Sequence, residues 1–290
     1  MRKHPAAPIL KLLILSLVLT PAIARSQETG SSPVHWAYSA YFGTGWYSVA
    51  GDRDVYVVRM TPRWTLKEPS LDADGGRSIG IYVKSPVSVG LDTFDYNDPA
   101  DAVDIDNVSF LSVNPGIDIE VPINDIWTLR PYASIGYGQE LGGSDSAWAY
   151  WAGVKSRLAF RSGKLNWRLI NLLGFVGYTP DEGPSDTIWP AMAGLEFDYP
   201  VGKPRGDADQ LLLHWHVAYS VFGDSLNFTD TPTVNWDITD QLEIGAAIGR
   251  RDSPIRIWFM KFDRLGLGYR ASSSGDLKGI MFVFRSMFDE

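Results

Sequence analysis

The chain lacks cysteine altogether and has only four histidines among its 290 residues. Without cysteine it forms neither disulfide bonds nor thiolate metal sites, so the fold holds together without covalent cross-links. Beyond its first 24 residues, the chain also lacks any apolar run of the roughly 20 residues that a transmembrane helix requires. Its formal net charge of −8 argues against nucleic acid as a partner.

A targeting segment occupies the N-terminus. Arg2 and Lys3 form a positive start, an apolar run covers 9–19, and Ala22-Ile23-Ala24 has the small-x-small pattern of a cleavage site. The apolar run is too short to span a membrane as a helix. We therefore expect a cleaved secretory signal peptide, and an uncleaved anchor is the less favoured alternative.

The predicted domain organisation follows from this segment. We expect the signal peptide over 1–24, a short periplasmic segment over 25–34 and one β-barrel domain over 35–290. Aromatic residues make up 13% of the chain, yet the mean hydropathy is only −0.09. A barrel in lipid places Trp and Tyr at both membrane interfaces and keeps a polar interior, which gives this combination. These features predict export to a Gram-negative outer membrane.

Short alternating segments separated by turn-forming residues follow one another along the chain. The predicted fold is all-β, a transmembrane antiparallel up-and-down barrel. The candidate strands are 35–47, 53–66, 77–90, 107–122, 126–140, 147–161, 164–178, 187–200, 210–222, 232–239, 241–250, 254–262, 264–271 and 277–288. We favour fourteen strands, which requires turns at both Asp240-Gln241 and Asp263-Arg264; twelve follow if neither is a turn. Segments 91–106, 141–146, 179–186 and 223–231 then connect strands at the outer end.

Each candidate strand has an apolar face and a polar face. Leu165, Trp167 and Leu169, for example, alternate with Asn166 and Arg168. A soluble sandwich would need a second sheet over every apolar face, so we interpret the apolar faces as lipid-facing and the polar faces as the lumen. The basic lumen residues predicted in this way are Arg59, Arg63, Lys84, Arg130, Lys155, Arg157, Arg168, Arg256 and Arg285, and the acidic ones are Asp118, Glu120, Glu196, Asp198 and Glu243.

The predicted lumen is therefore rich in basic residues although the chain is acidic. Charge that lines a pore sets its ion selectivity, so these residues predict a constriction that favours small anionic solutes. The alternative is a packed interior, in which Arg130 pairs with Asp118 or Glu120 across their hairpin.

His214 and His216 are the sharpest local signal. They share one face of a strand about 7 Å apart. Such a pair could bind a transition metal if a carboxylate joined it, or His216 could act as a general base beside Ser220 in a membrane-embedded lipid hydrolase. The alternative, which we favour, is two polar residues in a polar lumen, because two ligands without a visible third do not define a metal site.

Segment 91–106 holds six aspartates, namely Asp92, Asp95, Asp98, Asp101, Asp104 and Asp106. The segment could bind Ca²⁺ or bridge divalent ions to lipopolysaccharide, but it lacks the ligand spacing and glycine of a calcium-binding loop. We interpret it as a solvated acidic loop, while a surface-binding role for it stays open.

The C-terminal residues resemble the last strand of outer-membrane β-barrels. Gly279, Phe282 and Phe284 stand at the offsets of that strand, and Phe288 closes it on the same face as Phe282 and Phe284. This resemblance implies an assembly signal read by the barrel-assembly machinery, in a chain that contacts outer-membrane lipid and lipopolysaccharide.

Segment 129–138, Leu-Arg-Pro-Tyr-Ala-Ser-Ile-Gly-Tyr-Gly, is similar to strands of autotransporter-like barrels. Only about ten residues precede the first candidate strand after the signal peptide, so the resemblance implies a solitary barrel without a passenger domain. The sequence thus favours a small-solute channel without cofactor, metal or enzymatic activity. A structural or surface-binding barrel and a lipid-modifying enzyme remain as alternatives.

Overall fold

The computed structural model describes residues 43–49, 53–71, 76–92, 108–140, 146–181, 185–202, 210–226, 238–250, 255–257 and 260–290. The predicted signal peptide, the predicted periplasmic segment and most of the acidic loop lie outside these residues. None of the described residues forms a helix with the length and apolar character needed to cross a membrane.

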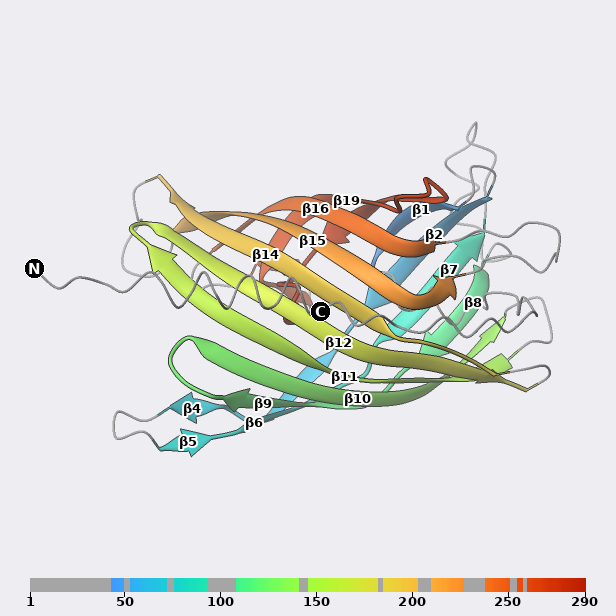
Figure 1. The fold of residues 1–290 in the computed structure, drawn as a ribbon, viewed down its shortest axis with the longest axis horizontal. Helices are drawn as coiled ribbons and strands as arrows, with labels where there is room; N and C mark the ends of the chain where they lie inside the picture. The colour runs from blue at the N-terminus through green and yellow to red at the C-terminus, as the bar shows by residue number, and fades with distance from the viewer. Residues whose placement is uncertain are drawn as a thin grey trace, which may run out of the picture. The chain divides into compact units, whose positions relative to one another are not determined.

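A closed barrel of twelve antiparallel strands forms the structure (Figure 1). Around its circumference run β1, β2, β7, β8, β10, β11, β12, β14, β15, β16, β19 and β20, and the pairing of β20 with β1 closes the ring. The bounds are β1 Gly45–Val49, β2 Arg53–Met60, β7 Val87–Asp92, β8 Val108–Val113, β10 Trp127–Glu140, β11 Ser146–Ser162, β12 Leu165–Pro180, β14 Pro190–Val201, β15 Leu211–Leu226, β16 Ile238–Arg250, β19 Arg264–Ala271 and β20 Leu277–Val283.

Three neighbouring strands are each broken by a proline into two halves. β2 continues as β3 (Arg63–Lys67), β6 (Gly80–Lys84) leads into β7, and β8 continues as β9 (Gly116–Pro122). The breaks fall at Pro62, Pro86 and Pro115, since proline has no N–H for the ladder. Main-chain hydrogen bonds still cross the breaks, from Ser85 N to Pro62 O at 3.1 Å and from Asn114 N to Pro86 O at 2.9 Å.

Five short strands lie outside the ring of barrel strands. They are β4 (Ser70–Leu71) paired with β5 (Arg77–Ser78), β13 (Asp186–Ile188) paired with β12, and β17 (Ile255–Ile257) paired with β18 (Met260–Phe262). The expected strand over 254–262 is therefore wrong, because β17 and β18 form a separate hairpin. Arg256 lies on β17, in this hairpin and outside the ring of barrel strands.

The favoured count of fourteen strands is also wrong, because no turn occurs at Asp240-Gln241. Both residues lie inside β16. The carboxylate of Asp240 accepts a hydrogen bond from Tyr219 Oη at 2.6 Å and another from the Ser273 main chain at 3.0 Å. A neighbouring strand and the β19–β20 turn thus satisfy the carboxylate of a residue type that otherwise favours turns, and β16 continues through it.

The two faces of the strands separate as the alternation predicts. Trp64, Leu173 and Ile280 on the outer face are 53%, 59% and 51% exposed, whereas Ile170 and Met281 on the inner face are 0% and 1% exposed. An apolar surface of this kind around a closed sheet is the feature that distinguishes transmembrane barrels from soluble ones.

Tight turns join strands at one end of the barrel, as at Gly163 (φ 59°) between β11 and β12. The antiparallel order places the ends of β7, β10, β12 and β15 together at the opposite end, where the four long segments were predicted.

The last strand is shorter than predicted. β20 ends at Val283, and a turn follows in which Asp289 N and Glu290 N donate to Ser286 O at 2.8 and 3.1 Å. Phe282 faces outward as expected and stacks on Phe284 at 5.9 Å. Phe288 was predicted on the same outer face, and this prediction is wrong: its side chain is 0% exposed inside the barrel, because the turn ends the two-residue alternation.

Candidate functional site in the barrel lumen

One side of the lumen carries a row of acidic and basic side chains on adjacent strands. Arg168 on β12 pairs with Asp198 on β14, whose carboxylate lies 2.6 Å from His214 Nδ1 on β15. Farther along the lumen, His216 Nε2 lies 2.8 Å from Glu243 on β16, and Arg270 on β19 lies 2.6 Å from the same carboxylate. We call these six residues the histidine ladder.

The two histidines do not converge on one ligand. Each imidazole contacts a different carboxylate, Asp198 or Glu243, and the described residues contain no group of three His, Asp or Glu placed to hold a metal ion. Ser220 lies four residues from His216, about 13 Å along an extended strand, which is too far for proton transfer between them. This spacing does not suit the alternative in which His216 acts as a general base beside Ser220.

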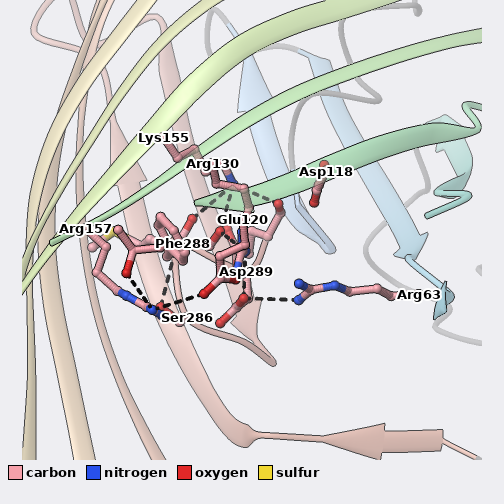
Figure 2. A network of polar contacts seen from close by, with 12 residues as sticks. Arg63, Asp118, Glu120, Arg130, Lys155, Arg157, Ser286, Phe288 and Asp289 are labelled. Atoms are coloured by element: carbon pink, nitrogen blue, oxygen red, sulfur yellow. Dashed lines mark hydrogen bonds and ion pairs between the residues drawn. The ribbon is translucent and has the colours of Figure 1, made fainter. Parts of the chain in front are cut away.

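The other side of the lumen carries basic residues that contact the chain's own C-terminus (Figure 2). Arg63 on β3 and Arg130 on β10 donate to the Asp289 carboxylate at 3.1 and 2.7 Å. Lys155 on β11 donates to main-chain oxygens of Met287 and Glu290 at 3.2 and 2.8 Å. We call Arg63, Arg130, Lys155 and Arg157 the basic cluster, and residues 286–290 the C-terminal segment.

Phe288 anchors the C-terminal segment in this cluster. The guanidinium groups of Arg130 and Arg157 lie 4.0 and 4.4 Å from its ring centroid, which is cation–π geometry. Arg130 also donates to Phe288 O at 2.8 Å and forms an ion pair with Glu120, as the packed-interior alternative expected. The wall thus contacts three parts of the segment: the Phe288 ring, the Phe288 main-chain oxygen and the Asp289 carboxylate.

Met287 and Phe288 also pack in an apolar cluster with Ile170, Ala218 and Met192. Gly194 on β14 provides the space for Met287: a Cβ placed on this glycine would lie 2.9 Å from Met287 Cε. The wall therefore complements the C-terminal segment in shape as well as in charge.

Glu196 connects the two sides of the lumen. Its carboxylate accepts hydrogen bonds from Ser286 Oγ at 2.7 Å and from Met287 N at 2.6 Å. Arg168 of the histidine ladder and Arg264 lie 3.4 and 3.7 Å from the same carboxylate. Glu196 is 0% exposed and has therefore lost its contact with water, and these partners compensate for that loss.

The charge of Asp289 depends on the basic cluster. Partial burial alone would raise its pKa, but the charges of Arg130, Arg63 and Arg157, together with the hydrogen bond from Arg130, outweigh burial and hold the pKa at about 2. The segment therefore carries a carboxylate that is ionised throughout the neutral and mildly acidic range.

The remaining predicted lumen residues occupy separate positions. Lys84 pairs with Asp118 at 2.8 Å on β6 and β9, and Arg59 lies 5.2 Å from the Trp151 ring. Arg285 lies past the end of β20 rather than on a wall strand. Of the acidic loop over 91–106, residues 93–106 lie outside the described residues.

Sequence reasoning missed the C-terminal segment as part of the lumen. It also missed Arg264 and Arg270, which are both buried. The available signal was the acidic pair Asp289-Glu290 directly after an aromatic residue, which fits poorly at the end of a lipid-facing strand. Phe288 has the same even-numbered parity as the outward-facing residues of 277–283. This parity predicts an outward side chain and does not show that the chain turns inward after Val283.

The fold and the lumen define a closed β-barrel of the outer-membrane type, with an apolar outer surface and a charged interior. No protein-family model matches the chain, and no curated protein matches it.

Solved structures share the fold. The translocator domain of the autotransporter NalP from Neisseria meningitidis aligns with a TM-score of 0.53 over 81% of this chain and 82% of that chain, at 10% identity. The β domain of the Bordetella autotransporter BrkA aligns at 0.51 over 82% and 92%, also at 10% identity. LpxR from Salmonella typhimurium aligns at 0.45 over 81% and 91%, at 12% identity. The predicted resemblance to autotransporter-like barrels is confirmed at the level of the fold.

Proposed function

We propose that the chain is an integral outer-membrane β-barrel that conducts small anionic solutes, and that its C-terminal segment closes the lumen in the described conformation. The observation that carries the proposal is the carboxylate of Asp289, which two guanidinium groups hold at 2.7 and 3.1 Å inside the barrel. Groups that hold one carboxylate by charge-assisted hydrogen bonds also attract other small anions.

The membrane location in this proposal rests on three supports. These are the signal-peptide pattern of 1–24, the exposed apolar side chains on the outer face of the barrel, and the fold shared with autotransporter barrels. Outer-membrane lipid, lipopolysaccharide and the barrel-assembly machinery are the partners that such a location requires. Small anions are the proposed solutes, and no cofactor enters the proposal.

We propose no enzymatic role for the histidines. His214 and His216 are each engaged by a carboxylate, and the described lumen brings no nucleophile to His216. Their contribution is to give the buried carboxylates of Asp198 and Glu243 a hydrogen-bond partner in the wall that faces the conducting path.

The experiment compares conductances in a planar bilayer. The full chain and its Phe288→Ala/Asp289→Asn variant are refolded, and the reversal potential is measured in a salt gradient. The full chain should be nearly silent, whereas the variant should conduct steadily and prefer anions, because it loses the ring and the carboxylate that hold the segment. Arg157→Glu with Arg168→Glu in that variant should shift the preference toward cations.

The matched control is Phe282→Ala/Asp276→Asn, which removes the same two residue types from the outer face and the β19–β20 turn. This control should behave like the unmodified chain. A Phe288→Ala/Asp289→Asn variant that folds but stays silent, or that prefers cations, would contradict the proposed channel.

A further inference from the structure

We infer that the lumen contains a peptide-binding site whose resident ligand is the C-terminal segment, and that the site binds, in trans, a short peptide carrying an aromatic residue followed directly by an acidic one. This inference deepens the proposed function and rests on it for the aqueous path by which such a peptide enters. The ligand class follows from what each part of the wall contacts.

The wall recognises main-chain atoms of the segment at several points. Arg130 donates to Phe288 O, Lys155 donates to Met287 O and Glu290 O, and Glu196 accepts from Met287 N at 2.6 Å. Such contacts are independent of sequence and suit any peptide in the same conformation. All three wall residues are buried, so each keeps its orientation without relying on solvent.

Two side-chain positions supply the selectivity. The first is the aromatic position: Phe288 lies between the guanidinium groups of Arg130 and Arg157 and against Ile170 and Ala218. The second is the acidic position next to it, where Arg63 and Arg130 bind the Asp289 carboxylate. An aromatic residue followed by an acidic one satisfies both positions, and an apolar pair leaves two guanidinium groups without their carboxylate.

Charge complementarity points to an acidic ligand. The basic cluster contains four basic side chains, and the wall places two carboxylates at this site: Glu120 beside Arg130 and Arg157, and Glu196, which Arg168 and Arg264 also contact. Asp289, which reduces this excess of positive charge, comes from the segment and not from a wall strand. The wall is thus built for an anionic peptide, and the chain's own C-terminus is one example of it.

Covalent attachment gives the resident segment an advantage over any free peptide. A short tether holds the segment at an effective concentration on the order of millimolar, so a free peptide of equal intrinsic affinity competes poorly. Binding in trans is therefore measured in a full-length chain whose own segment is weakened. Phe288→Ala/Asp289→Asn provides this host, because it removes both selective side chains and leaves the wall unchanged.

The experiment is isothermal titration calorimetry of two hexapeptides into this refolded host in detergent. One peptide has the sequence of residues 285–290, Arg-Ser-Met-Phe-Asp-Glu. The control peptide has Ala for the Phe and Asn for the Asp. We expect one-to-one saturable binding of the first peptide, at least about tenfold tighter than the control. In the unmodified chain the same peptide should bind at least about tenfold more weakly than in the host.

Equal affinity of the two peptides, or no saturable binding to the folded host, would overturn the inference. The host must first show the β-sheet circular-dichroism spectrum of the unmodified chain; the Asp289→Asn single variant serves as host if the double variant does not fold. Calorimetry separates this result from the channel proposal. A barrel that never conducts but binds the peptide contradicts only the channel, and one that conducts anions but ignores the peptide contradicts only the peptide site.

Discussion

The histidine ladder and the basic cluster face the same lumen but obtain their partners in different ways. In the ladder, Asp198 and His214 stand directly opposite each other on neighbouring strands, 16 positions apart in the chain. In the basic cluster, Arg130 and Asp289 are 159 positions apart and no strand pairing aligns them. The histidine ladder therefore forms with the sheet itself. The basic cluster has Glu120 from a wall strand as one partner, but it obtains the Asp289 carboxylate only when the C-terminal segment lies inside the closed barrel.

This difference indicates which part of the interior is permanent. The side-chain contacts of the histidine ladder persist as long as the strands stay paired. Contacts of the C-terminal segment can break while every strand remains paired. The segment follows β20 as a turn, and its described main-chain hydrogen bonds do not pair it with a wall strand. Lumen closure and barrel stability are consequently separable properties, and the following predictions test that separation.

The largest effects should come from removing one arginine on either side. Arg130→Met leaves the buried Glu120 with the longer 3.4 Å contact to Arg157, and Arg270→Met leaves the buried Glu243 without its guanidinium partner. Each should lower the free energy of unfolding by about 3–5 kcal/mol in denaturant titrations. Of these two variants, only Arg130→Met should also open the lumen to ions in a planar bilayer, because Arg130 contacts the C-terminal segment and Arg270 belongs to the histidine ladder.

Equal conductance of the two arginine variants would erase the distinction between the ladder and the cluster. A folded Arg130→Met barrel that stays silent would show that the segment is retained without its central contact.

Glu196→Gln should affect both sides at once, because Glu196 contacts Arg168 of the ladder and Ser286 of the segment. The amide keeps an oxygen acceptor but loses the charge that offsets Arg168 and Arg264. We expect a loss of about 2 kcal/mol in the free energy of unfolding and a partial increase in conductance. Asp118→Asn, which affects only the pair with Lys84, should lower stability without changing conductance.

Acidification should release the segment through Asp289. Its pKa is lowered to about 2 in the folded chain, so its contribution to docking is complete above the ordinary aspartate pKa of about 4 and is lost as the pH falls through about 2. Conductance of the unmodified chain should rise over that interval as Asp289 loses its attraction to Arg63, Arg130 and Arg157. In Asp289→Asn the rise should be smaller, and an identical rise would assign the effect to another carboxylate.

The smallest effect should come from Gly194→Ala. The added methyl would lie 2.9 Å from Met287 Cε and 3.1 Å from Ala218 Cβ, so Met287 must shift. We expect a loss of about 1 kcal/mol and a slight rise in the fraction of time the channel is open, read from single-channel records. Gly43→Ala, whose methyl would meet Met281 Cε at an ordinary 3.6 Å, should change neither quantity.

The sequence was sufficient for the closed antiparallel barrel and for the two faces of its strands. Two-residue alternation shows which side of a strand a residue occupies, so the sequence alone places Trp64 and Leu173 outside and Glu196 inside. The pairing of Arg130 with Glu120 was also foreseen, because a hairpin brings its two strands together.

The strand count and the C-terminal segment could not be predicted, for two physical reasons. Asp240 has the chemistry of a turn residue, and only its contacts with Tyr219 on β15 and Ser273 in the β19–β20 turn keep it inside β16. Phe288 has the parity of a lipid-facing residue, and only long-range contacts with Arg130 and Arg157 show that it turns inward. Alternation is a local property, and both features depend on residues far away in the chain.

Thiol accessibility at position 287 tests most directly whether the C-terminal segment fills the lumen. The chain contains no cysteine, so a full-length Met287→Cys variant carries a single thiol. Met287 is 7% exposed, and the variant keeps Phe288 and Asp289. We predict that this thiol reacts with a small water-soluble maleimide at least about 100-fold more slowly than the thiol of Ser274→Cys at the exposed β19–β20 turn. Comparable reaction rates in the folded barrels would contradict a docked segment and, with it, the proposed closed lumen.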